Sequence, residues 1–174
     1  ERILDRWGPI RTHLLVTEIS TLDGCPYCAN GHAYALQLHY LKKTEQLFPL
    51  RESDIITLQT QSEPEIVESL ESVLEQAELS ECLLDLRRMI ELRQNPTLAT
   101  TAKDQDILHL IRLFAILNTC AIEHKVQIDQ AHDPINKNRA WRDRYAILRR
   151  AESRLPQAPP EPDITVLNPS DLYQ

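Results

Sequence analysis

The sequence predicts an all-α fold, and three observations support this prediction. Only three of the 174 residues are glycine, which is unfavourable inside helices. Leu, Ala, Glu, Gln and Arg are abundant, and these side chains lose little rotamer freedom in a helix. Apolar residues recur along most of the chain at spacings of three and four, which places them on one helix face. We therefore expect a compact multi-helix bundle.

Two helices are predicted in the first quarter of the chain. Residues 10–22 carry an apolar stripe at helical spacing, and Pro9 suits the first turn because its missing N–H costs nothing there. An Asp-Gly pair then ends this helix. The second helix is predicted to begin near Pro26 and to continue to about Lys43. A proline at its start and a run of Ala and Leu along it favour this interpretation.

Three further helices are predicted in the middle of the chain. Ser53 is a candidate cap for a short helix, and residues 66–77 have clean amphipathic spacing. Ser80 is expected to begin the next helix, which ends near Asn95-Pro96. All three would contribute one apolar face to a shared core.

The most apolar helix is predicted over residues 104–129. Because residues 107–117 are hydrophobic on nearly every face, we expect this helix to lie at the centre of the bundle. Asp133-Pro134 resembles a cap and first helical position. It would open a last helix that carries Trp141, Tyr145 and Leu148.

The chain is predicted to form one helical domain, residues 1–154, followed by an extended Pro-rich tail, residues 155–174. Its length is within the range of a single hydrophobic core. Five prolines occur in the last twenty residues and exclude a regular helix there. The apolar residues Ile164 to Val166 could let this tail pack onto a neighbouring subunit.

Charge and hydropathy narrow the choice of partners. Nineteen basic and twenty-six acidic side chains give a net charge of −7, which would repel nucleic acid. The sequence shows no apolar run near the roughly 18 residues that a membrane span requires, and no signal peptide. We therefore expect a cytoplasmic protein with neither nucleic acid nor membrane as a partner.

Four cysteines occur, and only two of them are close together in the sequence. Cys25 and Cys28 form a Cys-x-x-Cys pair, whereas a secreted disulfide framework would be denser in so short a chain. In a reducing compartment such a pair indicates redox catalysis or metal binding. Cys82 and Cys120 lie on apolar stripes and are interpreted as core residues.

A histidine follows the pair at helical spacing. If the helix begins near Pro26, Cys25 caps it and Cys28 lies in its first turn. His32 then follows four residues later on the same face. The partial positive charge of a helix N-terminus favours a thiolate and lowers a cysteine pKa. His32 could hold or relay the proton that the sulfur gives up.

Residues 20–32, Ser-Thr-Leu-Asp-Gly-Cys-Pro-Tyr-Cys-Ala-Asn-Gly-His, resemble the alkylhydroperoxidase D-like and carboxymuconolactone decarboxylase superfamily. The resemblance is specific over about residues 11–41. It implies an AhpD-like helical fold that assembles as a homo-oligomer. It also implies a peroxidase in which Cys28 attacks the hydroperoxide and Cys25 resolves the intermediate.

One position departs from the family pattern. The family places a glutamate of a proton relay twelve residues before the first cysteine, and this chain has His13 there. An imidazole can relay protons, but it does not supply a fixed negative charge. Glu18 is the nearest acidic alternative, and it lies about 140° further around the helix.

The main hypothesis is a thiol peroxidase or disulfide oxidoreductase that uses Cys28, Cys25, His32 and His13. Its substrate would be a hydroperoxide or a disulfide, and an external dithiol would reduce it again. No metal or organic cofactor is expected.

Four alternatives stay open. His32 could transfer protons in a decarboxylase-branch enzyme, or the chain could be a non-catalytic helical assembly module. The two cysteines could also be buried apolar residues, or they could bind zinc together with His32. Three other histidines are expected on helix surfaces or at helix C-termini: His109, His124 and His132.

Overall fold

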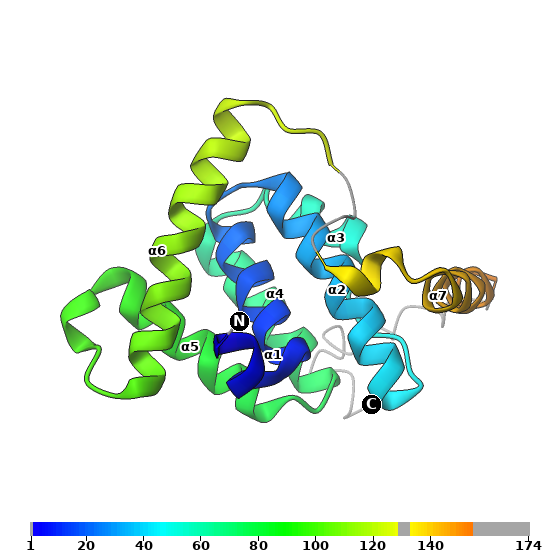
Figure 1. Ribbon diagram of the computed structural model, residues 1–174, viewed down its shortest axis with the longest axis horizontal. Helices are drawn as coiled ribbons and strands as arrows, with labels where there is room; N and C mark the ends of the chain where they lie inside the picture. Colours follow the sequence, from blue (N-terminus) through cyan, green and yellow to red (C-terminus); the bar gives the residue numbers. More distant parts are fainter. Residues whose placement is uncertain (1, 129–132, 155–174) are drawn as a thin grey trace, which may run out of the picture.

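The computed structural model describes residues 2–128 and 133–154, and over these residues it contains only helices (Figure 1). The predicted all-α class and multi-helix bundle are therefore confirmed. The predicted Pro-rich tail, residues 155–174, lies outside the described residues, as does His132. The elements are α1 (Arg2–Leu22), α2 (Pro26–Thr44), α3 (Glu52–Leu58), α4 (Glu63–Gln76), α5 (Ser80–Gln94), η1 (Pro96–Leu98), α6 (Ala102–Glu123), η2 (Pro134–Lys137) and α7 (Arg139–Glu152).

Helix α2 lies at the centre of the bundle. It packs most extensively on α1 and also contacts α3, α6, η2 and α7 (Figure 1). Small residues along α2, among them Ala29, Gly31, Ala33 and Ala35, are buried and allow neighbouring helices to approach closely. The main apolar core lies between α1 and α4, α5 and α6, with side chains such as Leu15, Leu74, Leu86 and Ile107 fully buried.

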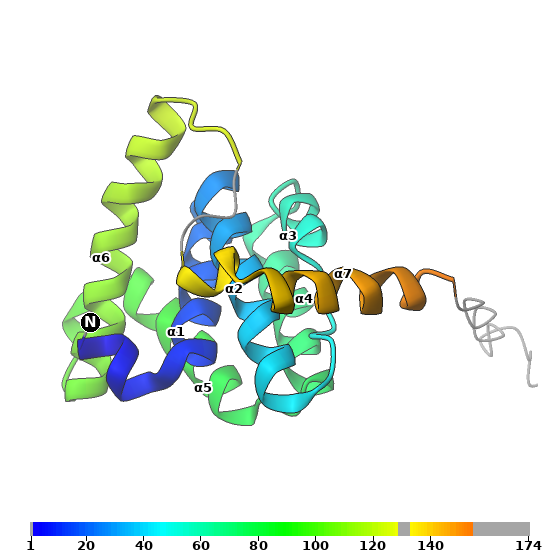
Figure 2. The same ribbon diagram turned by 45° about the vertical axis from the view of Figure 1, so that its right-hand side comes forward.

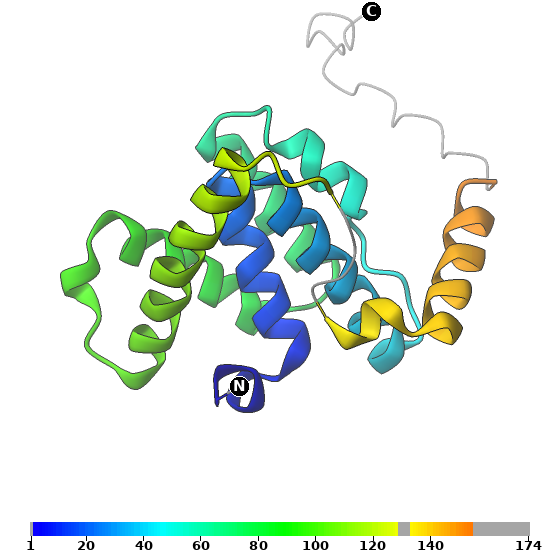
Figure 3. The same ribbon diagram turned by 45° about the horizontal axis from the view of Figure 1, so that its top comes forward.

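The prediction that the apolar helix over 104–129 is central was wrong. Its counterpart α6 ends at Glu123 and packs one face on α1, α2 and α5. The other face is open: Ile116 is 65% exposed, Leu117 is 44% exposed and Cys120 is also exposed. α6 and α7 lie on opposite sides of the α1–α2 pair (Figures 1 and 3). Apolar content alone did not distinguish a central helix from a peripheral one.

The exposed face of α6 also bears on the expectation of no membrane partner. By length and composition, α6 is the one helix among the described residues that could span a membrane. A third of its most apolar window is buried within the bundle. Core helices of soluble proteins have the same length and apolar composition.

The helix ends follow the predicted signals in part. The first helix begins at Arg2 and not near residue 10. Pro9 opens the straight part of α1, directly after a kink at Gly8, whose φ of 73° suits glycine. Arg51, not Ser53, is the N-cap residue of α3, so the Ser53 cap was wrong. Asp133-Pro134 opens the short helix η2 instead of the last helix, which begins five residues later after its cap Asn138. α6 ends at Glu123, before the predicted end at residue 129.

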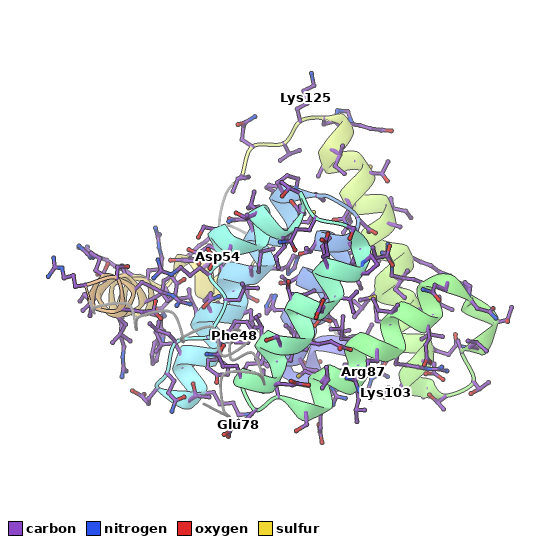
Figure 4. The ribbon with its side chains drawn as sticks, turned by 180° about the vertical axis from the view of Figure 1, so that it is seen from behind. Phe48, Asp54, Glu78, Arg87, Lys103 and Lys125 are labelled. Carbon is purple, nitrogen blue, oxygen red and sulfur yellow. The ribbon has the colours of Figure 1, made fainter. Side chains whose placement is uncertain are left out.

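Helix α7 extends sideways from the bundle and is held by polar contacts in its buried face (Figure 2). The Arg149 guanidinium is buried and donates to the side chain of Gln37 at 2.8 Å and to the carbonyl of Phe48 at 2.6 Å. Phe48, labelled in Figure 4, lies on the link after α2 and is itself buried. α7 is therefore fastened to both α2 and the segment that follows it.

Candidate functional site

The cysteine pair occupies the first turn of α2, as the sequence predicts. Cys25 is the N-cap residue, and its Sγ accepts a hydrogen bond from the backbone N–H of Cys28 at 3.4 Å. Both side chains are buried. They pack with Ala121, near the C-terminal end of α6, and with Tyr27.

A hollow of about 310 Å³ opens beside Cys25, between the start of α2 and the residues that end α6; Cys28 does not line it. Cys25 and Tyr27 line one side, and Ala121, Ile122 and Val126 line the other. The hollow therefore gives a small molecule an approach to the cysteine end of α2.

The pKa of the Cys28 thiol is shifted upward, whereas its place at a helix N-terminus predicted a downward shift. Burial, and after it the neighbouring Cys25 and the charge of Asp23, together raise this pKa to about 12. The predicted lowering is thus wrong for Cys28, because desolvation outweighs the helix dipole. At neutral pH this thiol is protonated, and it needs a base before it can act as a nucleophile.

A second group of side chains lies on the adjoining turns of α1 and α2. His13 and His32 face each other with 3.0 Å between their Nδ1 atoms. The Nε2 atom of His13 lies 3.1 Å from Oδ2 of Asp133, which comes from the segment before η2. The structure thus brings together the two predicted histidines and adds a carboxylate that sequence reasoning had interpreted only as a cap.

The hydrogen bonds fix the protons in the neutral form of this chain. Asp133 can only accept, so the proton of His13 lies on Nε2. The Nδ1 atom of His13 then accepts from the Nδ1–H of His32. This leaves the lone pair of His32 on Nε2. The order Asp133, His13, His32 is therefore a continuous path along which a proton can be shared.

Asp133 is built to stay charged. Its hydrogen bond with His13 holds the pKa of the carboxyl well below its usual range, although burial opposes this. The backbone N–H of Ile135 also donates to Oδ1 at 2.8 Å, which is the cap of η2. η2 is itself anchored on α2, because Asn136 donates to the carbonyl of Gly31 at 3.1 Å. Position 13 has no carboxylate, but Asp133, which is hydrogen-bonded to His13, supplies a fixed negative charge beside it.

His39 completes the group and was not singled out in the sequence. It lies two turns after His32 on α2, stacks on His13 with ring centroids 5.4 Å apart, and has Nε2 3.5 Å from Oδ1 of Asp133. Burial and the neighbouring His13 lower its pKa. The spacing of seven residues between His32 and His39 is the signal that could have identified it.

Glu18 does not take part in this group. It is fully buried, neither carboxylate oxygen has a hydrogen-bond partner, and burial and the charge of Asp85 raise its pKa well above the ordinary value. Its electrostatic neighbours, Asp85 and Cys82, both belong to α5. The position 140° around α1 thus turns Glu18 toward α5 and not toward His32.

Among the other cysteines and histidines, some predictions are confirmed and one is wrong. Cys82 is buried as expected, and burial raises its pKa to about 12. Cys120 was predicted in the core and is exposed, because it lies on the open face of α6. His109 and His124 are exposed on α6 and at its end, as expected.

Comparison with known proteins adds no relative. No protein-family model matches the chain, and no curated protein or solved structure is detectably similar to it. These comparisons lend no support to the AhpD-like resemblance, so the family assignment rests on the motif alone.

Proposed function

We propose that the protein is a thiol-dependent oxidoreductase, a peroxidase or disulfide reductase, that uses the Cys25–Cys28 pair. The observation that carries this proposal is the chain of hydrogen bonds from Asp133 through His13 to His32, whose last imidazole lies one helical turn after Cys28. A buried thiol with a pKa of about 12 needs a base, and in this proposal His32 has that role.

The reaction with a hydroperoxide would begin at the thiol of Cys28. Cys28 gives its proton to His32, and the thiolate attacks the peroxide oxygen, so that the O–O bond breaks and a sulfenic acid forms. The leaving alkoxide takes the proton and departs as an alcohol. The thiol of Cys25 then displaces the hydroxyl of the sulfenic acid, which forms the Cys25–Cys28 disulfide and water. An external dithiol reduces this disulfide and is itself oxidised.

A disulfide substrate would follow the same path. The Cys28 thiolate attacks one sulfur, and the released thiolate takes the proton held by the histidines. The Cys25 thiol then resolves the mixed disulfide and frees the second half of the substrate as a thiol. The hollow beside Cys25 is small and largely apolar in its α6 wall, which favours a small organic substrate.

Asp133 would do the work that the resemblance assigns to a glutamate. In the AhpD-like interpretation, a carboxylate supports the histidine that serves the cysteines. Here His13 occupies the glutamate position and passes the charge of Asp133 on to His32. This substitution of two side chains for one supports an AhpD-like relay despite the departure at position 13.

The same proposal includes the expected partners and setting. An external dithiol, a cytoplasmic location and assembly as a homo-oligomer belong to it. The exposed apolar residues of α6, Leu113, Ile116 and Leu117, support assembly, because a face of this kind is commonly covered by another subunit.

A non-catalytic helical module is the second candidate. The burial of both cysteines and the raised pKa of Cys28 favour it, since inert structural cysteines have these properties. The two candidates differ in the reactivity of the thiols and not in the fold.

Mass spectrometry and peroxide consumption test the proposal directly. The reduced full chain is treated with an organic hydroperoxide and then with a dithiol. We expect a Cys25–Cys28 disulfide and turnover in the parent. Cys28→Ser should abolish turnover, and Cys25→Ser should stop the reaction at a sulfenic acid on Cys28. Cys120→Ser is the matched control, because Cys120 is exposed and outside the pair. Equal peroxide consumption by the parent and Cys28→Ser would reject the assignment.

A further inference from the structure

Three potential metal ligands converge where α1, α2 and the start of η2 meet. They are Nε2 of His13, Nε2 of His39 and a carboxylate oxygen of Asp133, and all lie within 4.8 Å of one another. Oδ2 of Asp133 is 3.1 Å from the His13 atom, and Oδ1 is 3.5 Å from the His39 atom. The Nε2 atom of His39 is buried and makes no hydrogen bond, although it faces this carboxylate.

These separations fit a tetrahedral ion. Zinc lies about 2.0 to 2.2 Å from histidine nitrogen and carboxylate oxygen, so two ligand atoms of a tetrahedral site are about 3.3 Å apart. The separations of 3.1 Å and 3.5 Å, each from a different oxygen of Asp133, lie on either side of that value. Two imidazoles and one carboxylate are also a ligand set that suits first-row transition metals and leaves coordination positions open.

An ion could reach the site from the surface. A cavity of about 670 Å³ lies between the start of α1, the end of α2 and the link from α4 to α5. His39 is part of its wall. The charged residues of the wall have both signs: Glu78, Glu81, Arg11, Lys42 and Lys43. A buried ligand set with a route to solvent is what metal loading of a folded protein requires.

We propose that His13, His39 and Asp133 form a binding site for a divalent first-row transition metal ion such as Zn²⁺, with at least one coordination position open. This site is separate from the cysteine pair and uses none of the sulfur atoms. The Nδ1 atom of His13 would keep its contact with His32, which is the kind of outer hydrogen bond that orients a metal-binding histidine.

Metal binding would also regulate the redox reaction, a consequence that rests on the proposed function. The ion would bind the lone pair of His13 Nε2, so the single proton of this neutral imidazole would move to Nδ1 and point at His32. The Nδ1 atom of His32 would then accept that proton's hydrogen bond, and the proton of His32 would lie on its Nε2 atom. His32 could then no longer take a proton from Cys28, so the metal-loaded protein would activate Cys28 poorly.

Titration of the reduced full chain with Zn²⁺ by calorimetry, and with Co²⁺ by visible absorption, tests the site. We expect one ion per chain and a Co²⁺ spectrum without the strong thiolate charge-transfer band. His39→Phe keeps a ring stacked on His13 but removes a ligand, and it should weaken binding at least about 100-fold. His39→Gln serves if the Phe variant misfolds by circular dichroism. His124→Phe is the matched control, since this histidine is exposed at the end of α6.

The outcomes separate this site from a cysteine site. Unchanged affinity in the Cys25→Ser, Cys28→Ser double variant supports the proposal, whereas loss of binding there would assign the metal to the cysteines and overturn it. Absence of saturable binding to the parent, or equal affinity of the parent and both His39 variants, would also overturn it. If Zn²⁺ slows peroxide turnover in the parent but not in His39→Phe, the regulatory part holds. A protein that binds Zn²⁺ at this site without redox activity would reject the proposed function alone.

Discussion

Asp133 and Glu18 are two carboxylates that lie on different sides of α1 and have opposite surroundings. Asp133 contacts His13, accepts a backbone N–H and has its pKa held low. Glu18, five residues after His13, is completely buried without a hydrogen bond and has its pKa raised. The comparison shows that closeness in sequence does not decide which acid serves a site. The acid that serves His13 is 120 residues away along the chain.

The difference has a simple physical cause. A carboxylate keeps its charge only where donors replace the water that it loses. Asp133 has two such donors, the Nε2–H of His13 on α1 and the backbone N–H of Ile135 in η2. α5 instead presents Asp85 to Glu18, and Asp85 is already paired with Arg11 and with Lys103, which is labelled in Figure 4. Glu18 is therefore pushed toward its neutral form.

The largest effect is expected from removing the charge of Asp133. Asp133→Asn keeps the shape of the side chain but not its charge, so the histidines lose the group that stabilises a transferred proton. Peroxide turnover and the rate of Cys28 alkylation at pH 7 should fall by about 100-fold or more. Stopped-flow kinetics measures both rates.

The control for this change is Asp143→Asn, which alters an exposed acid of α7. It should leave both rates unchanged. Rates in Asp133→Asn equal to those of the parent would show that the histidine chain needs no carboxylate.

Glu18→Gln should have an effect on stability and none on turnover. Because the folded-state pKa of Glu18 is raised, folding retains a proton that the unfolded chain releases above about pH 4.5. The parent therefore loses stability as pH rises from about 4.5 toward the folded-state pKa, by up to about 1.4 kcal/mol per pH unit. Glu18→Gln lacks this loss, so its advantage in the free energy of unfolding should grow over the same range.

Urea unfolding at several pH values between 4.5 and 8 measures this difference. Glu68→Gln, on the exposed face of α4, is the matched control and should follow the pH dependence of the parent. A constant difference between Glu18→Gln and the parent would mean that Glu18 does not retain its proton on folding.

The smallest effect is expected at Asp23, a third carboxylate. Its charge raises the pKa of Cys28, and it is held by Arg93 at 2.5 Å and by Asn118 at 2.8 Å. Asp23→Asn should lower the pKa of Cys28 and speed its alkylation at pH 8 by about threefold. Mass spectrometry of the alkylated residue resolves this change. A slower reaction would show that Asp23 positions Cys28 more than it opposes the thiolate.

The sequence predicted where helices begin and end better than it predicted which side chains pack around them. The first turn of α2, with Cys25 as its cap and Cys28 within it, followed from Pro26 and the Asp-Gly break. These signals depend only on residues close together in the sequence, so they can be interpreted without knowledge of the tertiary structure. The open face of α6 and the burial of Cys28 depend on which helices pack together, and no local pattern contains that information.

The histidine group shows the same limit within the site. His13 and His32 could be paired because both lie on helices joined by a short turn. Asp133 could not be assigned to this group, because its place before Pro134 is fully explained by a role as a helix N-cap. Its contact with His13 arises from the route by which the chain returns to α2 after α6, which is a long-range property of the fold.

The buried guanidinium of Arg149 has a consequence beyond the packing of α7. It ties that helix to Gln37 and to the carbonyl of Phe48, and α7 directly continues the segment that presents Asp133. A residue in the last turns of the chain's final described helix thus helps to set the distance between an acid and an imidazole at the other end of that segment. Replacing this arginine should therefore loosen the contact between Asp133 and His13, although neither of these two residues is changed.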